Sequence, residues 1–304
     1  MTVNSLAFVT TVLSLSGCGE TTGALPDARQ DAGVDSSLAC NPAGAFGNIR
    51  AVGGLNSARE NEFVSLSHDE LTVYFADDSA APGTPNFDLY VASRPTTGTP
   101  FGAPVPLAAL NTGSDDRSPS VSADGLSLFF HSSRGTSYDL YVSTRTSTGV
   151  SFGAPTPLGA SINTSFTETS PAISADGQTL YFDRDEGTGS RLFRSTLGPT
   201  GFQAPTPVSE LDTGSAHSAA LTADGRTIFF ASDRAGGAGM IDIWTASRAS
   251  TQVPFGAIAN VAELGTALQE FPDWVSTDGC RLYFTAERSG GAGGFDIFVA
   301  DRAP

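Results

Sequence analysis

Short apolar runs recur along this chain, and within each run consecutive residues are apolar. The five runs are Val73-Tyr74-Phe75, Leu128-Phe129-Phe130, Leu180-Tyr181-Phe182, Ile228-Phe229-Phe230 and Leu282-Tyr283-Phe284. A strand that is apolar at every position has no face for water and has to be buried between two other layers. The runs therefore predict strands sandwiched between neighbouring sheets.

A turn aspartate precedes each apolar run, and a run such as Asp-Leu-Tyr follows it. The turn aspartates are Asp69, Asp124, Asp176, Asp224 and Asp278, spaced by 55, 52, 48 and 54 residues. A repeat of this length with several short strands per copy is typical of a β-propeller. We expect an all-β protein, a five-bladed propeller of four-stranded antiparallel blades.

The second copy shows how four strands fit into one repeat. Residues 119–122 and 126–131 predict the first hairpin, and residues 139–142 predict the third strand. A fourth strand begins at Phe152 and carries Pro157, which an edge strand tolerates.

The two ends of the chain complement each other. The last copy stops after its third strand, at Ile297-Phe298-Val299, and the missing fourth strand matches Phe46-Gly47-Asn48-Ile49. We therefore expect the N-terminal strand to complete the fifth blade. Cys40 and Cys280 then come to the same face. Two states stay open for them: a disulfide that closes the ring, which export would permit, or two unpaired thiols.

Charge excludes one class of partner. The chain of 304 residues has 16 basic residues against 32 acids, a net charge of −16. Such a chain is repelled by nucleic acid and by anionic lipid surfaces. We expect no nucleic-acid partner.

The chain begins with an apolar stretch, residues 6–15, that leads into Ser16-Gly17-Cys18. This start resembles a bacterial lipobox, which implies acylation of Cys18 and contact with the membrane only through that lipid. A cytoplasmic protein with an apolar N-terminus is the alternative. The expected organisation is a signal peptide at 1–17, a disordered tether at 18–43 and the propeller at 44–304.

Opposite charges flank the second hairpin in four copies, and the signs are reversed together in one of them. We interpret them as structural ion pairs across the hairpin. The pairs are Arg134 with Asp139, Glu186 with Arg191, Arg234 with Asp242, and Arg288 with Asp296.

Asp116, Glu168 and Glu270 each lie eight residues before a turn aspartate, so we expect their loops to meet at one mouth of the channel. Two interpretations stay open: a site for a cation or polar ligand, or acids that cap loop backbone. Trp274 stands where other copies have Ser or Ala, and either plugs the channel or stacks on a sugar.

Motifs for other chemistry are missing from the sequence. His68, His131 and His217 have no metal-ligand spacing, and no nucleophile elbow occurs. We expect no resident metal or cofactor beyond a cation that the channel-mouth acids could bind.

The runs at residues 230–243 and 287–298 resemble the TolB-type, WD-repeat-like propeller of bacterial envelope proteins, and residues 46–302 share the repeat. The resemblance implies a periplasmic or surface-attached interaction platform without enzymatic activity, with six blades as the alternative count.

These observations lead to two hypotheses of function. The first is a non-catalytic, lipid-anchored scaffold that binds an envelope protein or glycan at the periplasmic side of the outer membrane or at the cell surface. The alternative is a five-bladed glycoside hydrolase. In that case Asp116, Glu168 and Glu270 would act as acid, base and pKa modulator, with Trp274 as a sugar platform.

Overall fold

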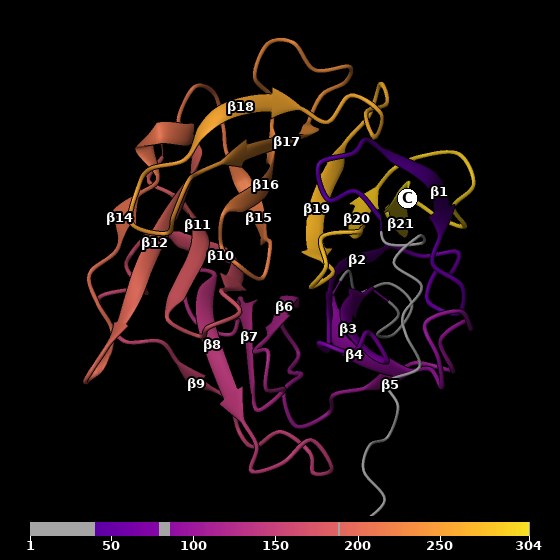
Figure 1. Cartoon of the computed structure of the whole chain (residues 1–304). Helices are drawn as coiled ribbons and strands as arrows, with labels where there is room; N and C mark the ends of the chain where they lie inside the picture. The colour runs from indigo at the N-terminus through magenta and orange to yellow at the C-terminus, as the bar shows by residue number, and fades with distance from the viewer. Residues whose placement is uncertain (1–39, 79–85, 188, 304) are drawn as a thin grey trace, which may run out of the picture. The chain divides into compact units, whose positions relative to one another are not determined.

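A computed structural model describes residues 40–78, 86–187 and 189–303 (Figure 1). These residues form five antiparallel sheets that are the blades of a five-bladed β-propeller, which confirms the predicted fold. Helical structure in the described part is confined to one 3-10 turn, Ser209–Leu211. The six-bladed alternative is thereby excluded. None of the described helices is long and apolar enough to cross a membrane.

The innermost strand of each blade contacts the innermost strands of both neighbouring blades, which closes the ring around a central channel. These strands are β2 (Asn61–Leu66), β6 (Asp116–Val121), β10 (Thr167–Ile173), β15 (His217–Leu221) and β19 (Glu270–Val275). We call the end of the channel at which they begin the channel mouth.

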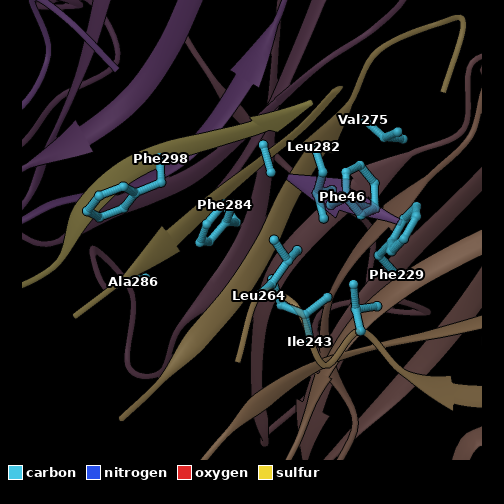
Figure 2. Packing of buried hydrophobic residues seen from close by; sticks show 12 residues of the cluster. Phe46, Phe229, Ile243, Leu264, Val275, Leu282, Phe284, Ala286 and Phe298 are labelled. Atoms are coloured by element: carbon cyan, nitrogen blue, oxygen red, sulfur yellow. The ribbon is translucent and has the colours of Figure 1, made fainter. Parts of the chain in front are cut away.

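The second strands carry the apolar runs, and their central phenylalanines are fully buried. These strands are β3 (Thr72–Asp77), β7 (Ser127–Ser132), β11 (Thr179–Asp185), β16 (Thr227–Ser232) and β20 (Arg281–Ala286). Figure 2 shows one interface, in which Phe229 of the fourth blade packs with Phe46 and Leu282 of the fifth. Burying each such side chain stabilises the fold by roughly 1.5 to 3 kcal/mol.

The third strand is longer than the fourth strand in every blade. The third strands are β4 (Asp88–Ser93), β8 (Asp139–Thr144), β12 (Ser190–Gly198), β17 (Asp242–Ser247) and β21 (Asp296–Arg302). The outer strands are β5 (Val105–Pro106), β9 (Thr156–Pro157), β14 (Thr206–Pro207), β18 (Gly256–Asn260) and β1 (Phe46–Ala51), and β13 (Gly201–Phe202) extends the third blade. The expected start of β9 at Phe152 is wrong, because Phe152 packs into the core before the strand begins.

The chain ends close the ring as predicted. Strand β1 pairs antiparallel with β21, and Figure 1 shows the two side by side. Cys40 and Cys280 form a disulfide with Cα atoms 5.9 Å apart. The Asn41 amide donates to the carbonyl of Ala303 at 3.0 Å, so residues 40–43, expected in the tether, are held against the last blade. Cys18 and its lipobox lie outside the described residues.

The predicted cross-hairpin ion pairs are wrong. Arg134 pairs with Asp116 rather than Asp139, and Arg191 pairs with Asp212 rather than Glu186. In the other two copies the aspartates accept hydrogen bonds from loop amides instead. The donors are Ala238 and Gly239 for Asp242, and Ala292 and Gly293 for Asp296.

The reason lies in what the arginines at the end of the second strand do. Each stacks over aromatic rings of its own blade and donates to a carbonyl of the loop before the blade. The donor–acceptor pairs are Arg134 with Leu110, Arg184 with Ile162, Arg234 with Leu211, and Arg288 with Leu264. In the third blade Arg184 takes this role from two residues earlier in the strand, and Glu186, which stands at the position of the other arginines, lies 3.9 Å from Arg184.

Candidate active site at the channel mouth

The three acids expected at the channel mouth point into the loops instead. Asp116, Glu168 and Glu270 are 0% exposed. Each accepts a hydrogen bond from a threonine four residues earlier, and Glu168 also accepts one from Arg184 at 2.8 Å. Of the two interpretations, the structure agrees with acids that cap loop backbone, because Asp116 and Glu168 also accept hydrogen bonds from the amides of Thr112 and Thr164. The expectation of a ligand site formed by these three acids is thus corrected.

The residues one position further along each inner strand lie at the channel mouth. Successive side chains of a strand point to opposite sides, so these residues face away from the loops that hold the buried acids. They are Glu62, Arg117, Thr169, His217 and Phe271. Contacts join them across blades: Arg117 lies on Glu62, and His217 lies on Phe271.

One guanidinium joins two carboxyl groups at the mouth. Arg117 Nη1 lies 3.6 Å from Glu62 Oε2, and Nη2 lies 3.3 Å from Asp115 Oδ2. The Phe87 ring lies 3.5 Å beneath the guanidinium. Tyr138 donates its hydroxyl to Asp115 Oδ2 at 2.6 Å. Arg117 and both acids are therefore held in place by neighbours in the first and second blades.

The two acids have opposite pKa shifts. Burial raises the pKa of Glu62 to about 7, against the attraction of Arg117 and with a further rise from Glu60. Burial also works to raise the pKa of Asp115, but hydrogen bonds from Tyr138 and a backbone amide, together with Arg117, lower it. Glu62 therefore keeps its proton up to neutral pH, while Asp115 is ionised.

Aromatic side chains border the other part of the mouth. Phe271 contacts Phe63, His217 and Phe295, with ring centroids 6.1, 6.3 and 5.8 Å apart. All four rings are partly exposed. The mouth thus combines charged side chains from the first two blades with aromatic side chains from the last two blades and from β2.

Below the mouth, a cavity of about 100 Å³ lies between the inner strands. Trp274 and Asp273 line it, together with mostly small side chains. Trp274 packs edge-on against Tyr283, with ring centroids 5.8 Å apart. It lies deeper in the channel than Phe271, by three residues or roughly 10 Å along the strand. Burial raises the pKa of Asp273 well above its ordinary value, although Asp273 Oδ2 accepts a hydrogen bond from Thr285 at 2.7 Å.

Sequence reasoning missed Glu62, Asp115 and Arg117. It selected acids at the repeated position, and those acids are structural. The position beside them holds a different residue type in every blade, from Glu to Arg, Thr, His and Phe. A position that differs in every copy of the repeat was therefore the sequence signal that could have identified the residues at the channel mouth. Within residues 40–78, 86–187 and 189–303, no cluster of three or more acidic, His or Cys side chains is arranged to hold a metal ion.

Comparison with known proteins rests on structure alone, because no protein-family model and no curated protein sequence matches. The catalytic domain of the Coprinopsis cinerea GH62 α-L-arabinofuranosidase is 12% identical, with a TM-score of 0.57 over 86% of this chain and 98% of that one. A Podospora anserina α-L-arabinofuranosidase, solved with cellotriose, is 11% identical, with a TM-score of 0.55 over 87% and 98%.

TolB from Acinetobacter baumannii is 15% identical, with a TM-score of 0.51 over 81% of this chain. The present chain spans 55% of the length of that TolB. At these identities the likeness to each structure shows the fold alone, and it supports the predicted resemblance to TolB only as far as the propeller.

The comparisons correct the first hypothesis of function. We expected a non-catalytic scaffold and no enzyme, on the basis of the propeller fold, the lipobox-like start and the lack of a convincing catalytic set. Yet glycoside hydrolases match over almost their whole length, whereas TolB matches over little more than half. The expectation of a non-catalytic scaffold is therefore withdrawn, and the acids first assigned to the hydrolase alternative are buried in their loops.

Proposed function

We propose that this protein is a glycoside hydrolase whose active site lies at the channel mouth. Glu62 is the proton donor and Asp115 is the ionised carboxylate. One observation carries the proposal: two carboxyl groups share the Arg117 guanidinium, yet their environments shift their pKa values in opposite directions. Such a separation of pKa values is how enzymes assign acid and base roles to two similar groups.

The spacing of the two acids suits this reaction. Both carboxyl groups contact one guanidinium, so they are no farther apart than the carboxyl pairs that flank a glycosidic bond, which stand roughly 5 to 9.5 Å apart. The previously expected acids each belong to a different loop and each serve that loop, whereas Glu62 and Asp115 both contact the Arg117 guanidinium, whose side chain is 24% exposed.

In the reaction, Glu62 gives its proton to the glycosidic oxygen as the bond from that oxygen to the anomeric carbon breaks. Asp115 takes a proton from the water whose oxygen attacks the same carbon. The proton lost by Glu62 is thus balanced by the proton gained by Asp115. Arg117 positions both carboxyl groups, and its charge keeps Asp115 ionised.

The substrate class we propose is a neutral oligosaccharide. Structural neighbours include α-L-arabinofuranosidases, one of them in complex with cellotriose, and a hydrolase in complex with xylotriose. The partly exposed rings around Phe271 supply an apolar surface of the kind that lines small-molecule sites.

We further propose that the enzyme works outside the cytoplasm, in a bacterial envelope and attached through Cys18. The disulfide between Cys40 and Cys280 supports an oxidising compartment. The lipobox-like run that ends at Cys18 supports the lipid attachment.

Hydrolysis by variants of the two acids tests the proposed function. The substrates are 4-nitrophenyl α-L-arabinofuranoside, xylotriose and cellotriose. We expect Glu62→Gln and Asp115→Asn each to lower kcat/KM at least about 100-fold on the substrate that is cleaved. Wild-type activity should fall as pH rises through about 7, because Glu62 then loses its proton. Asp176→Asn, at a turn on the other face, should change neither.

Two results would contradict this assignment. The first is unchanged turnover in Glu62→Gln with a folded protein, shown by an unaltered circular dichroism spectrum. The second is failure of the wild-type protein to cleave any of the three glycosides.

A further inference from the structure

Phe63 has a backbone conformation that its side chain disfavours. Its φ is +51°, in the left-handed region, where a bulky residue is strained. The first strands of three other blades have the same bend, with φ between 48° and 50°, but the residue there is always serine. These residues are Ser118, Ser170 and Ser218. Serine thus occupies this bend in three blades. The fifth has Pro272 there without a positive φ, and the first places a phenylalanine on the bend.

Core packing does not account for the departure. Phe63 is partly exposed, although both of its neighbours in β2 are buried. Phe63 lines a second, smaller cavity of about 30 Å³ between the inner strands, and its ring contacts Phe271, 6.1 Å away between centroids. A structural phenylalanine would be expected in the buried core rather than on a strained bend at the opening of a channel.

The surroundings hold the strained bend in place. The Phe63 amide donates to Thr285 Oγ1 at 2.8 Å, and Thr285 in turn donates to Asp273. Phe271 is fixed by Phe295 on its other side, at 5.8 Å. Because the rings are held before any ligand arrives, little conformational entropy is lost when one binds.

Phe63 follows the proposed proton donor, Glu62, in β2, and the bulge that begins there interrupts the usual alternation of side chains. We propose that Phe63 and Phe271 form a stacking platform for a neutral sugar ring next to the bond to be cleaved, so that both act as positioning residues. This inference rests on the proposed function and names how that site holds its substrate. The two rings offer only apolar faces, so they select the C–H face of a sugar, while polar recognition falls to the charged group around Arg117.

The test measures binding and stability in the same variants. In the Glu62→Gln background, Phe63→Ser installs the residue that three other blades use. We expect it to weaken binding of xylotriose or cellotriose, measured by titration calorimetry, at least about tenfold. The Tm should stay unchanged or rise, because serine relieves the strained bend. Phe63→Tyr, which keeps the ring, should restore binding to within about threefold.

The outcomes separate this inference from the proposed function. Unchanged affinity in Phe63→Ser would overturn the platform, as would failure of both trisaccharides to bind, even if Glu62→Gln abolishes hydrolysis. A lower Tm with unchanged affinity would give Phe63 a structural role only. Binding that depends on Phe63 in a wild-type protein without hydrolytic activity would support the platform and overturn the hydrolase.

Discussion

Single polar side chains on the second strands support the bent first strand of the next blade. In three places such a side chain accepts a hydrogen bond from the amide of the residue with positive φ. The pairs are Phe63 with Thr285, Ser170 with His131, and Ser218 with Asp183. Each bend would otherwise leave a buried amide without an acceptor, which costs about 1 to 3 kcal/mol.

Two of these acceptors have strongly shifted pKa values. Burial lowers the pKa of His131 to about 3, so the ring is neutral and its Nδ1 is free to accept the Ser170 amide. Burial raises the pKa of Asp183 to about 8, against the hydrogen bonds from Ser218 and Ser170. Asp183 is therefore protonated in the folded protein at pH 7 but ionised in the unfolded chain.

This difference makes stability depend on pH. Between pH 4 and 8 the folded state keeps the Asp183 proton that the unfolded chain releases, so stability is lost as pH rises through that window. Asp183→Asn keeps an oxygen that accepts the Ser218 amide and removes the titration. We expect its Tm to decline less than the wild-type Tm between pH 5 and 9, by several degrees, in thermal scans followed by circular dichroism. Parallel curves for the two proteins would contradict the assignment.

At the scale of the blade, an arginine at the end of the third strand connects neighbouring sheets. Arg94, Arg145, Arg248 and Arg302 each lie over a phenylalanine of their own blade, 4.1 to 4.3 Å from the ring centroid. Three of them also donate to a tyrosine hydroxyl of the preceding blade. These contacts are Arg94 to Tyr283, Arg145 to Tyr74, and Arg248 to Tyr181.

The third blade lacks this arginine, and its neighbour lacks the hydroxyl. Leu197 occupies the arginine position, and in the second blade Phe129 stands at the position that is tyrosine in the three contacts above. Phe129 packs edge-on against Phe202, with centroids 5.9 Å apart. At the junction of the fourth and fifth blades Arg302 lies over the Phe229 ring instead, 5.8 Å from its centroid. The hydroxyl thus accompanies the arginine at three of the four junctions that have one, and it is absent where leucine replaces the arginine.

Exchanging the aromatic residues tests this pairing. Tyr74→Phe removes the acceptor of Arg145 and should lower the free energy of unfolding by about 1 kcal/mol. Phe129→Tyr adds a hydroxyl in a buried place that offers no arginine, and should also destabilise the protein, by about 1 to 3 kcal/mol. Urea unfolding of both variants measures the two effects. A neutral or stabilising Phe129→Tyr would show that arginine does not determine the choice.

Predictions of single strands and hairpins were correct where they rested on neighbouring residues in the sequence. The second strands could be predicted because three consecutive apolar residues specify burial on both faces. The ion pairs could not, because the arginines bond to carbonyls of the preceding loop, and in the third blade Arg184 does so from two residues before the aligned position. The prediction of the channel acids was wrong for a different reason. Side chains alternate along a strand, so Asp116 and Glu168 point into their loops and the next residue of each strand points the other way.

At the scale of the whole propeller, closure depends on residues from both ends of the described chain. Strand β1 supplies the outer strand of the last blade, and the disulfide joins residues 240 positions apart. A cross-link over so long a loop removes many conformations from the unfolded chain, so it stabilises the folded state.

Reduction of this disulfide is therefore expected to lower the free energy of unfolding by about 2 to 4 kcal/mol. Urea unfolding with and without reductant measures the change. The double variant with Cys40→Ser and Cys280→Ser should match the reduced protein and show no response to reductant. A wild-type protein whose midpoint is insensitive to full reduction would disprove this role.

The sequence by itself determined the number of blades, the strands that are buried on both faces and the joining of the two ends. These features follow from which residues have to avoid water and from the period at which they recur. The choice of acids at the mouth was decided only by the tertiary structure. The burial of the mouth acids, their shared contact with Arg117 and the support of the bend at Phe63 depend on contacts between blades, made by residues far apart in the chain. A comparison of one repeat with another does not reveal such contacts.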